Sequence, residues 1–366
     1  MAVMKLVLED GTTLRGRAFG AIREVAGEVV FNTGLTGYVE TLTDPSYRGQ
    51  ILVTTYPLQG NYGVPAPRAP GSLDGPFESD RVQVQGMVCV RHSARPHHRA
   101  SARTLGDWLA ASDVPGIEGI DTRTLTRILR ERGTMRGAIL HDASDPASAD
   151  SLADTVPMRD VVALTTVPAP VLYPGGDLRV ILVDTGSKDN IARSLLARGA
   201  TVLRVPAHAD LGALAADYDG VMLSNGPGDP KDNPGLIAQI RGLLDRRMPL
   251  FGVCLGNQLL SLAAGGDTYK LPYGHRSQNQ PVQDLLTRRC YITSQNHGYA
   301  VRDDSLRDGW EPWFVNVNDG TNEGVRSREF PASSVQFHPE ARPGPEDTAF
   351  LFDDFLRLVG SMKRGR

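Results

Sequence analysis

Cys254 lies in a short motif that is typical of a catalytic nucleophile. The segment GVCLG, residues 252–256, stands between an apolar run that predicts a buried strand and a run that predicts a helix. The pattern Gly-X-nucleophile-X-Gly places a reactive side chain on a sharp turn, where glycines are needed because Cβ atoms would crowd the backbone. At a helix N-terminus, backbone N–H groups and the helix dipole lower the thiol pKa from its free value of about 8.5. The alternative is a small buried cysteine that packs under the sheet.

A base for this thiol is offered by His338 and Glu340 in the segment SVQFHPE. Pro339 disfavours helical backbone at His338, and side chains two residues apart in an extended chain project to the same side. Glu340 can then accept a hydrogen bond from one ring nitrogen of His338 and leave the other nitrogen facing Cys254. A surface His-Pro-Glu turn without chemistry is the alternative for this segment taken alone.

A third element is the loop LSNGPGDP, residues 223–230, which follows another apolar run. Because the carboxyl ends of parallel strands share one edge of a sheet, we expect this loop on the same rim as Cys254. Gly226 and Gly228 permit close approach of the backbone, and an N–H near Gly226 together with that of Leu255 could hold an oxyanion. A plain Gly/Pro turn and a phosphate cradle are the alternatives, although the loop lacks the Lys-Ser/Thr ending of a P-loop.

The other candidate residues carry weaker signals. Cys89 and Cys290 each lie in an apolar run that predicts the core of a strand. His275 and His297 are candidate ligands or pocket residues, but no carboxylate or second histidine stands at metal-ligand spacing. We therefore expect no metal ion. The chain also lacks a P-loop, and we expect no other cofactor in it.

The elements that must position these residues lie in the C-terminal part, residues 178–366. Strands are predicted by LRVILVD, ATVLRVP, GVML and PLFGVC, and helices by SKDNIARSLLARG, GLIAQIRGLLDRR and LGNQLLSLAAGG. This alternation predicts a parallel sheet covered by helices on both faces. Short extended runs follow residue 267, so we expect a mixed open sheet, with a last helix near EDTAFLFDDFLRLV.

The N-terminal part, residues 1–150, has a different character. Its strand patterns are separated by Gly-rich turns, and its one clear helix, DTRTLTRILRERG, can be capped by Asp121 and ended by Gly133. Residues 151–177 contain several prolines and glycines without a sustained period, which is typical of a linker. The fold prediction is therefore α/β throughout: a β-rich domain over 1–150, a linker over 151–177 and a mixed α/β domain over 178–366.

Length and composition restrict the class of protein. A chain of 366 residues suits two domains, and 40% hydrophobic with 22% charged residues is ordinary for a globular protein. The net charge of -3 offers no field that attracts nucleic acid or a membrane surface. The beginning MAVMKLVLEDG reaches acidic residues too early for a signal peptide, and no run approaches ~20 apolar residues. Three cysteines without metal spacing favour a reducing compartment, so we expect a cytoplasmic location.

The Gly-Pro-Gly loop, the cysteine turn and the His-Pro-Glu segment, in that order, resemble the class I (triad) glutamine amidotransferases. Further stretches resemble the small, glutaminase subunit of carbamoyl-phosphate synthase. They are GEVVFNTGLTGYVETLTDPSYRGQILV, PLQGNYG, GIDTRTLTRILRERGTMRGAI, YGHRSQNQPV, SQNHGYAV and FHPEARPGP. The resemblance covers roughly residues 3–360. The first three stretches lie in the N-terminal half, which other amidotransferases lack.

The resemblance also implies roles for individual residues. Cys254, His338 and Glu340 are expected to form the catalytic triad, and Ser46, in DPSY, is expected to reach the glutamine from the N-terminal domain. A substrate ammonium and carboxylate need hydroxyl, amide and backbone partners. The further residues expected to bind L-glutamine are Gly226, Gly228, Leu255, Gln258, Asn296, Gly298 and Tyr299.

Two positions depart from the family pattern. Ser277 stands where the family usually has a glycine, which puts a local turn in question because glycine tolerates φ > 0. Asn257 follows the cysteine turn where many relatives carry histidine.

The family hydrolyses glutamine through a glutamyl thioester and passes the ammonia to a large subunit. That subunit uses ATP, Mg and bicarbonate to make carbamoyl phosphate for arginine and pyrimidine biosynthesis. By resemblance, the expected partners are L-glutamine and the large subunit, which forms a heterodimer or a higher oligomer with this chain. We expect the chain to bind neither nucleic acid nor a membrane. The alternatives are a subunit of another triad amidotransferase, a Cys-type α/β hydrolase and a catalytically silent docking subunit, against which the intact triad residues argue.

Overall fold

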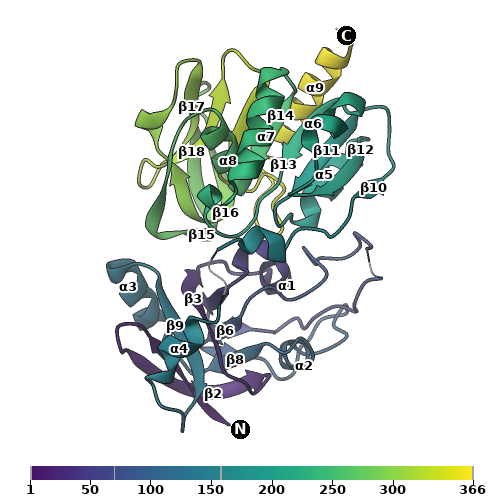
Figure 1. Cartoon of the computed structure of the whole chain (residues 1–366). Helices are drawn as coiled ribbons and strands as arrows, with labels where there is room; N and C mark the ends of the chain where they lie inside the picture. The colour runs from purple at the N-terminus through teal and green to yellow at the C-terminus, as the bar shows by residue number, and fades with distance from the viewer. Residues whose placement is uncertain (1, 70, 157–158, 365–366) are drawn as a thin grey trace. The chain divides into compact units, whose positions relative to one another are not determined.

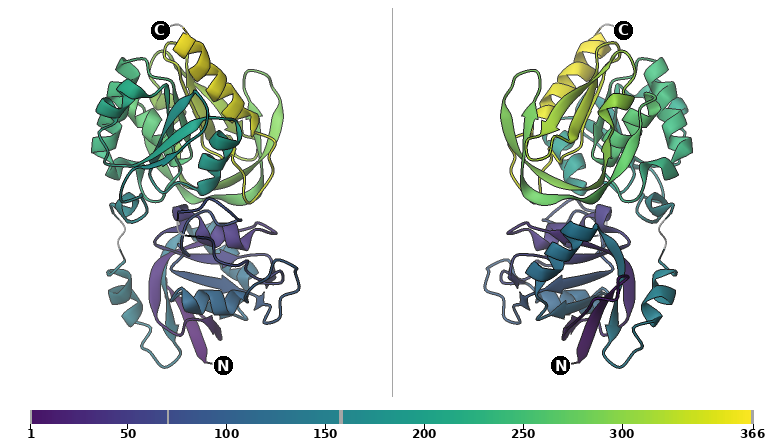
Figure 2. Two further views of the ribbon diagram at one scale, coloured as in Figure 1. Left: turned by 90° about the vertical axis from the view of Figure 1, so that its right-hand side faces the viewer. Right: turned by 90° about the vertical axis from the view of Figure 1, so that its left-hand side faces the viewer.

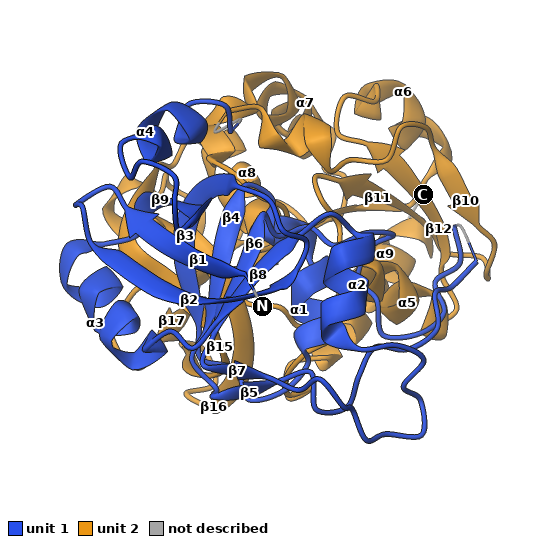
Figure 3. Cartoon of the chain, turned by 90° about the horizontal axis from the view of Figure 1, so that it is seen from below, with its two compact units in different colours: residues 1–158 blue, residues 159–366 orange. Residues whose placement is uncertain are grey.

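The computed structural model describes residues 2–69, 71–156 and 159–364 of the chain. The chain divides into two compact units, Met1–Met158 and Arg159–Arg366, which Figure 3 colours separately. Each unit has its own cluster of buried apolar side chains, which is the anatomy of a domain.

The first unit is built on a closed barrel. Its strands follow the order β1-β2-β8-β6-β4-β3-β9 (Figure 1). β1 pairs with β2 on one side and with β9 on the other, so the closure removes the open sheet edges that would invite pairing with another chain. The strand bounds are Val3–Leu8 (β1), Thr13–Gly20 (β2), Val25–Asn32 (β3), Gln50–Thr54 (β4), Gly86–Cys89 (β6), Pro115–Glu118 (β8) and Met135–His141 (β9), and a separate pair is formed by Leu58–Gln59 (β5) and Arg91–His92 (β7).

The helix expected in this unit is α3, Thr122–Arg132. Asp121 caps it by accepting a hydrogen bond from the N–H of Thr124 at 3.0 Å, and Gly133, with φ 93°, ends it. Both capping predictions are confirmed. The other helices described in the unit are Tyr38–Thr43 (α1), Leu105–Ala111 (α2) and Ser148–Ala153 (α4).

The second unit is a mixed open sheet in the order β10-β12-β11-β13-β14-β19-β18-β17-β15-β16. Parallel pairing joins the strands β12, β11, β13, β14 and β19. Antiparallel pairing adds β10 at one end and the strands β18, β17, β15 and β16 at the other. This mixed pattern confirms the predicted fold class. The bounds are Val171–Tyr173 (β10), Arg179–Asp184 (β11), Thr201–Pro206 (β12), Gly220–Leu223 (β13), Leu250–Val253 (β14), Thr268–Asp284 (β15), Cys290–Val301 (β16), Trp310–Asn316 (β17), Asn322–Ser327 (β18) and Ala332–Val335 (β19).

Helices lie on both faces of this sheet (Figure 2). Ile240 of α7 and Leu259 of α8 belong to one apolar cluster with Val183 of β11. On the other face Phe355 of α9 packs against Phe251 of β14, with ring centroids 5.9 Å apart. The helix bounds are Asp189–Ala197 (α5), Leu211–Leu214 (α6), Pro234–Asp245 (α7), Leu255–Ala263 (α8) and Phe350–Arg364 (α9).

The expected linker, residues 151–177, holds regular structure. It contains the end of α4, a 3-10 turn at Val161–Leu164 and strand β10, which pairs with β12 at the edge of the sheet. The boundary between the two compact units falls between residues 158 and 159.

The three cysteines of the chain are free, and Cys89 is buried in β6 as predicted. Cys290 is exposed, so its prediction as strand core is wrong. It begins β16, the last strand of the sheet, and the described residues form no further strand beyond it. Among the helices that the structure describes, none is both long and apolar enough to cross a bilayer.

Candidate active site

The candidate site begins where the parallel strands of the second unit end. The loops after β11, β13, β14 and β19 leave the sheet at one edge because these strands run in the same direction. Cys254 follows β14 directly, and His338 lies three residues beyond the end of β19. The fold therefore brings to one rim the segments that the sequence marks as reactive.

Cys254 has a strained backbone, with φ 54° and ψ −102° immediately before α8. A residue other than glycine in this region is held there by its surroundings, and such strain is typical of a nucleophile turn. The N–H of Cys254 donates to the carbonyl of Val335 at 2.8 Å, which ties the turn to β19. The side chain is buried, with 2% of its residue surface exposed.

The glycines on either side of Cys254 make this turn possible. A Cβ atom on Gly252 would lie 2.5 Å from the carbonyl oxygen of Gly256, and one on Gly256 would lie 2.3 Å from that of Leu223. Real Cβ atoms do not approach backbone oxygens so closely, so the predicted crowding is present in the structure. Strand β14, the turn and α8 are thus packed backbone against backbone.

His338 and Glu340 lie as the alternation argument predicts. His338 Nδ1 is 2.6 Å from Oε1 of Glu340, and the two side chains are almost completely buried. Burial by itself lowers the pKa of His338, but the Glu340 carboxylate and the Cys254 side chain overcome this and raise the pKa to about 10. Within the described residues Nε2 of His338 has no hydrogen-bond partner, and this nitrogen remains available for Cys254.

Lys188 is part of the site, although the sequence analysis did not single it out. Its Nζ lies 3.1 Å from Oε1 of Glu340 and donates to the carbonyl oxygen of Ala341. Burial raises the pKa of Glu340, but Lys188 and then His338 outweigh it and lower the pKa to about 2. A buried carboxylate therefore stays ionised beside His338 because a buried ammonium compensates it. The available signal was a lysine two residues after the turn that ends an apolar strand, in VDTGSKDN.

The loop that carries Lys188 is held by two buried ion pairs. Arg204 lies 2.9 Å from Asp184 and 2.7 Å from Asp189, and Asp184 also accepts the N–H of Ser187 at 2.7 Å. The N–H of Lys188 donates to the side chain of Asn225 at 2.9 Å. The N–H of Lys188 thus joins the loop after β11 to the loop after β13.

Two backbone N–H groups remain for an oxyanion. Within residues 159–364, no hydrogen bond from the N–H of Gly226 or Leu255 to a protein acceptor is found. A Cβ atom on Gly226 would lie 2.0 Å from the carbonyl oxygen of Thr185, so glycine is required for this loop to pack there. Gly228 follows with φ 89°, in the left-handed region.

Strand β16 also contacts Cys254. The thiol contacts the carbonyl oxygen of Asn296 at 3.7 Å, and Gln258 Nε2 donates to the carbonyl of Tyr299 at 3.0 Å. Asn296 and Tyr299 flank Gly298 on this strand, so four of the residues expected to bind glutamine are brought together. Ser46 lies in the first unit, in the 3-10 turn Pro45–Tyr47, and its expected role stays a prediction.

The two departures from the family pattern differ in how their side chains are paired. Asn257 is fully buried, donates to Gln336 Oε1 at 3.1 Å and accepts from Ser334 Oγ at 2.8 Å. Ser277 lies inside β15 without a positive φ, whereas the left-handed residue of this segment is Gly274, with φ 68°. Serine at position 277 therefore causes no backbone strain, but within the described residues its buried Oγ has no hydrogen-bond partner.

The fold and the site define a class I glutamine amidotransferase. The family model described as Glutamine amidotransferase class-I matches residues 181–358, and the model described as Carbamoyl-phosphate synthase small chain, CPSase domain, matches residues 6–139. The chain belongs to the carbamoyl-phosphate synthase small-chain family, which confirms the resemblance.

Two relatives that match over nearly their full length support this membership. The chain is 47% identical to a carbamoyl phosphate synthase small chain of Oceanobacillus iheyensis, over 99% of this chain and 98% of that one. It is 47% identical to one of Methanocaldococcus jannaschii, over 96% and 98% of the two chains. It is also 42% identical to the Multifunctional protein URA2 of Saccharomyces cerevisiae, over 99% of this chain but 18% of that protein.

Proposed function

We propose that this chain is the glutamine-hydrolysing subunit of a carbamoyl-phosphate synthase and that Cys254, His338 and Glu340 are its catalytic triad. The observation that carries the proposal is the strained turn at Cys254 beside a buried His338–Glu340 pair whose carboxylate is also paired with Lys188. This combination supplies a nucleophile, a proton carrier and a group that fixes the tautomer of the carrier.

In the first half-reaction the Cys254 thiolate attacks the side-chain amide carbon of glutamine. The raised pKa of His338 keeps its ring protonated, which stabilises the thiolate as an ion pair. The negative oxygen of the tetrahedral intermediate is held by the N–H groups of Gly226 and Leu255. His338 donates its Nε2 proton to the leaving nitrogen, the C–N bond breaks, and ammonia departs while a glutamyl thioester remains.

In the second half-reaction water hydrolyses the thioester. His338, now neutral, accepts a proton from the water as the oxygen attacks the thioester carbonyl. The C–S bond breaks, glutamate leaves, and the thiolate and imidazolium are restored. The net reaction consumes glutamine and water and releases glutamate and ammonia.

The α-amino and α-carboxylate groups of glutamine need partners outside the triad. We assign them to Gln258, Asn296, Gly298 and Tyr299, with Gly228 at the loop and Ser46 from the first unit. No metal or other cofactor has a role in these steps in this chain, because the side chains and backbone N–H groups supply the nucleophile, the acid and the oxyanion partner.

The ammonia acceptor is assigned to a separate large subunit that binds ATP and Mg and forms a heterodimer or a higher oligomer with this chain. The names of the small-chain relatives support this partner, and so does the yeast match to one part of a multifunctional protein. Free ammonia is protonated in water and diffuses away. A glutaminase that cannot itself use the ammonia therefore needs to dock to a protein that does. We assign docking to the barrel of the first unit. We place the complex in the cytoplasm and propose that its product is used for arginine and pyrimidine synthesis.

One assay tests this proposal. Glutamate release is measured for the purified chain alone and with a large subunit, and a chloroketone analogue of glutamine is used to label the thiol. We expect slow hydrolysis by the chain alone, faster hydrolysis in a stable complex, and mass-spectrometric labelling of Cys254. A permanent interface of more than ~1,600 Å² should survive gel filtration. A chain that hydrolyses glutamine at full rate alone and gains nothing from any large subunit contradicts the synthase assignment and leaves the triad intact.

A further inference from the structure

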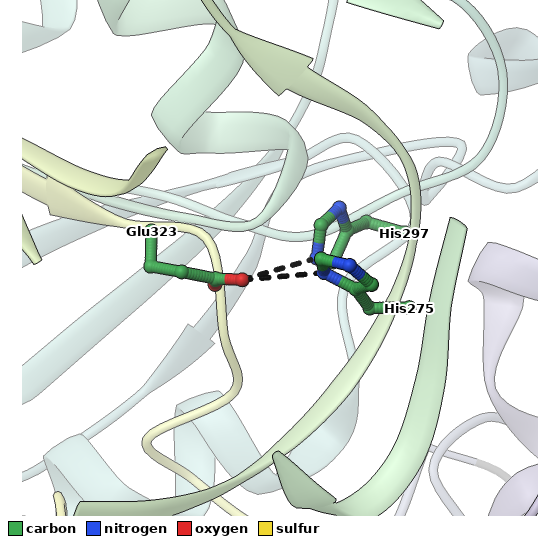
Figure 4. Close-up of side chains that lie close together, drawn as sticks. All are labelled: His275, His297 and Glu323. Carbon is green, nitrogen blue, oxygen red and sulfur yellow. Dashed lines mark ion pairs between the residues drawn. The ribbon is translucent and has the colours of Figure 1, made fainter. Parts of the chain in front are cut away.

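A second cluster of chemically active side chains lies on the antiparallel half of the sheet. His275 of β15 and His297 of β16 stand directly opposite each other in the strand register, so both side chains project from the same face. Glu323 of β18 points between them, and Figure 4 shows the three side chains converging. All three residues are buried, and none belongs to the proposed triad.

The facing atoms are close enough to share one ion. Oε1 of Glu323 lies 3.3 Å from Nδ1 of His275 and 3.9 Å from Nε2 of His297, and the three atoms lie within 4.8 Å of one another. Zinc bonds of about 2.0–2.1 Å place tetrahedral ligands about 3.4 Å apart, so the His275–Glu323 pair already has this spacing. The ring of His297 has to move inward to complete the site.

The outer nitrogen of each ring is already held in the manner of a metal ligand. Nε2 of His275 lies 2.8 Å from a carboxylate oxygen of Asp319, and Nδ1 of His297 lies 2.8 Å from the carbonyl oxygen of Tyr299. Both partners accept, so these outer nitrogens carry the N–H. When each ring is neutral, the lone pair of its inner nitrogen then points toward Glu323. Metal-binding histidines almost always have such an outer partner, which fixes the tautomer and the ring orientation.

The space between the rings holds more acceptors than donors. Besides Glu323, the Oε1 atom of Gln295 lies 3.2 Å from Nε2 of His297, so this nitrogen faces two oxygen acceptors. The Asn316 amide donates to Oε1 of Glu323 at 3.0 Å and also lies 3.5 Å from Nδ1 of His275, but in the described part of the chain Oε2 of Glu323 is buried without a partner. A proton on Nδ1 of His275 would satisfy its contact with Glu323. Nε2 of His297 would still face the oxygens of Glu323 and Gln295. One divalent cation would satisfy both rings and the carboxylate.

We propose that His275, His297 and Glu323 bind one zinc ion, with Gln295 Oε1 as the nearest fourth ligand. Two imidazole nitrogens and a carboxylate are ligands that suit zinc, and the negative charges of Glu323 and Asp319 balance the positive charge of the ion. The ion has no part in the hydrolysis. It clamps β15 to β16 beside Asn296 and so stiffens the strand. This site does not depend on the proposed glutaminase function, since it rests on other side chains.

Zinc affinity of the full chain is the test, measured by competition with a chromophoric chelator. The background carries Cys254→Ser and Cys290→Ser, because both thiols can bind zinc and the remaining Cys89 is fully buried. We expect one zinc ion per chain, with affinity at least about tenfold weaker in His275→Gln and Glu323→Gln. His208→Gln, which removes an exposed histidine, is the matched control and should leave the affinity unchanged.

A second variant covers the case in which the buried substitutions prevent folding. Asp319→Asn alters a side chain that is 40% exposed, and loss of an outer partner weakens metal affinity by about 10–100-fold. Cobalt provides an independent readout, because a nitrogen and oxygen site gives a visible d–d absorption without the near-ultraviolet band of a cobalt–thiolate bond. Absence of stoichiometric zinc in the background chain, or parent affinity in both His275→Gln and Asp319→Asn, overturns the proposal.

Discussion

Nζ of Lys188 lies 3.1 Å from Oε1 of Glu340, and the same oxygen lies 2.6 Å from Nδ1 of His338. One carboxylate oxygen thus serves a buried ammonium and a buried imidazole. Because Lys188 lowers the pKa of Glu340, it keeps the carboxylate charged at a depth where desolvation favours the neutral acid. Within the proposed triad, we therefore assign Lys188 as a positioning residue that acts on His338 through Glu340.

Lys188→Met should move the acidic limb of the kcat profile upward in pH. Without the ammonium, the pKa of Glu340 rises from about 2 toward its ordinary value of 4.5, so the carboxylate protonates at higher pH. At neutral pH Glu340 stays ionised and kcat should fall by about tenfold or less. Lys363→Met, which removes a partly exposed lysine at the end of α9, is the control. An acidic limb that does not move would mean that Lys188 has no effect on Glu340 in solution.

Cys254→Ser should abolish glutamine-dependent synthesis in the complex with the large subunit. A serine hydroxyl is a poor nucleophile without the thiolate ion pair, so kcat should fall by ~10⁴-fold or more, as for loss of a nucleophile in other triads. Synthesis from added ammonia should persist, because this path does not use the thiol. Retained use of glutamine by the variant would refute the nucleophile assignment.

Glu340→Gln should keep the fold and slow glutamine hydrolysis. The amide cannot stabilise the imidazolium and favours the wrong tautomer of His338, which costs about 10⁴-fold in a related triad. Circular dichroism checks the fold and glutamate release gives the rate. Hydrolysis at the parent rate would make Glu340 structural, and the third member of the triad would have to be sought elsewhere.

The stability difference between the parent chain and Glu340→Gln should depend on pH in two windows. The pKa of Glu340 is lowered from 4.5 to about 2, so its contribution is present above pH 4.5 and is lost as the pH falls toward 2. The pKa of His338 is raised from 6.5 to about 10, so its contribution is present below pH 6.5 and is lost as the pH rises through 10. Urea unfolding should show the largest difference between pH 4.5 and 6.5, whereas a pH-independent difference would contradict both shifts.

Gly256→Ala should destabilise the second unit and disturb the nucleophile turn. The new Cβ would lie 2.3 Å from the carbonyl oxygen of Leu223, and relieving such a clash costs about 1–3 kcal/mol. Gly242→Ala, in α7, has nothing within 4 Å of the new Cβ and should stabilise the helix by roughly 0.5–1 kcal/mol. Thermal unfolding of both variants measures the contrast. Equal stability of the two variants would show that the turn can relax around a side chain.

The sequence alone was sufficient for the parts of the site that are local in the chain. The order of strand, glycine turn and helix around Cys254 predicts a nucleophile turn because a short segment determines its own backbone geometry. The alternation of side chains across Pro339 predicts that His338 and Glu340 lie on one side, and the structure places them so. Asp121 and Gly133 likewise mark the ends of α3.

Only the tertiary structure decided which distant residues meet. Lys188 reaches Glu340 because β11 and β19 end at the same edge of a parallel sheet, and no spacing in the chain encodes this edge. His275 and His297 face each other because β15 and β16 pair in one particular register, and a shift by one residue would put them on opposite faces. Glu323 joins them from β18, a strand that pairs with neither β15 nor β16. The pairing of strands depends on the packing of the whole sheet. Local sequence patterns therefore do not predict which side chains this pairing brings together.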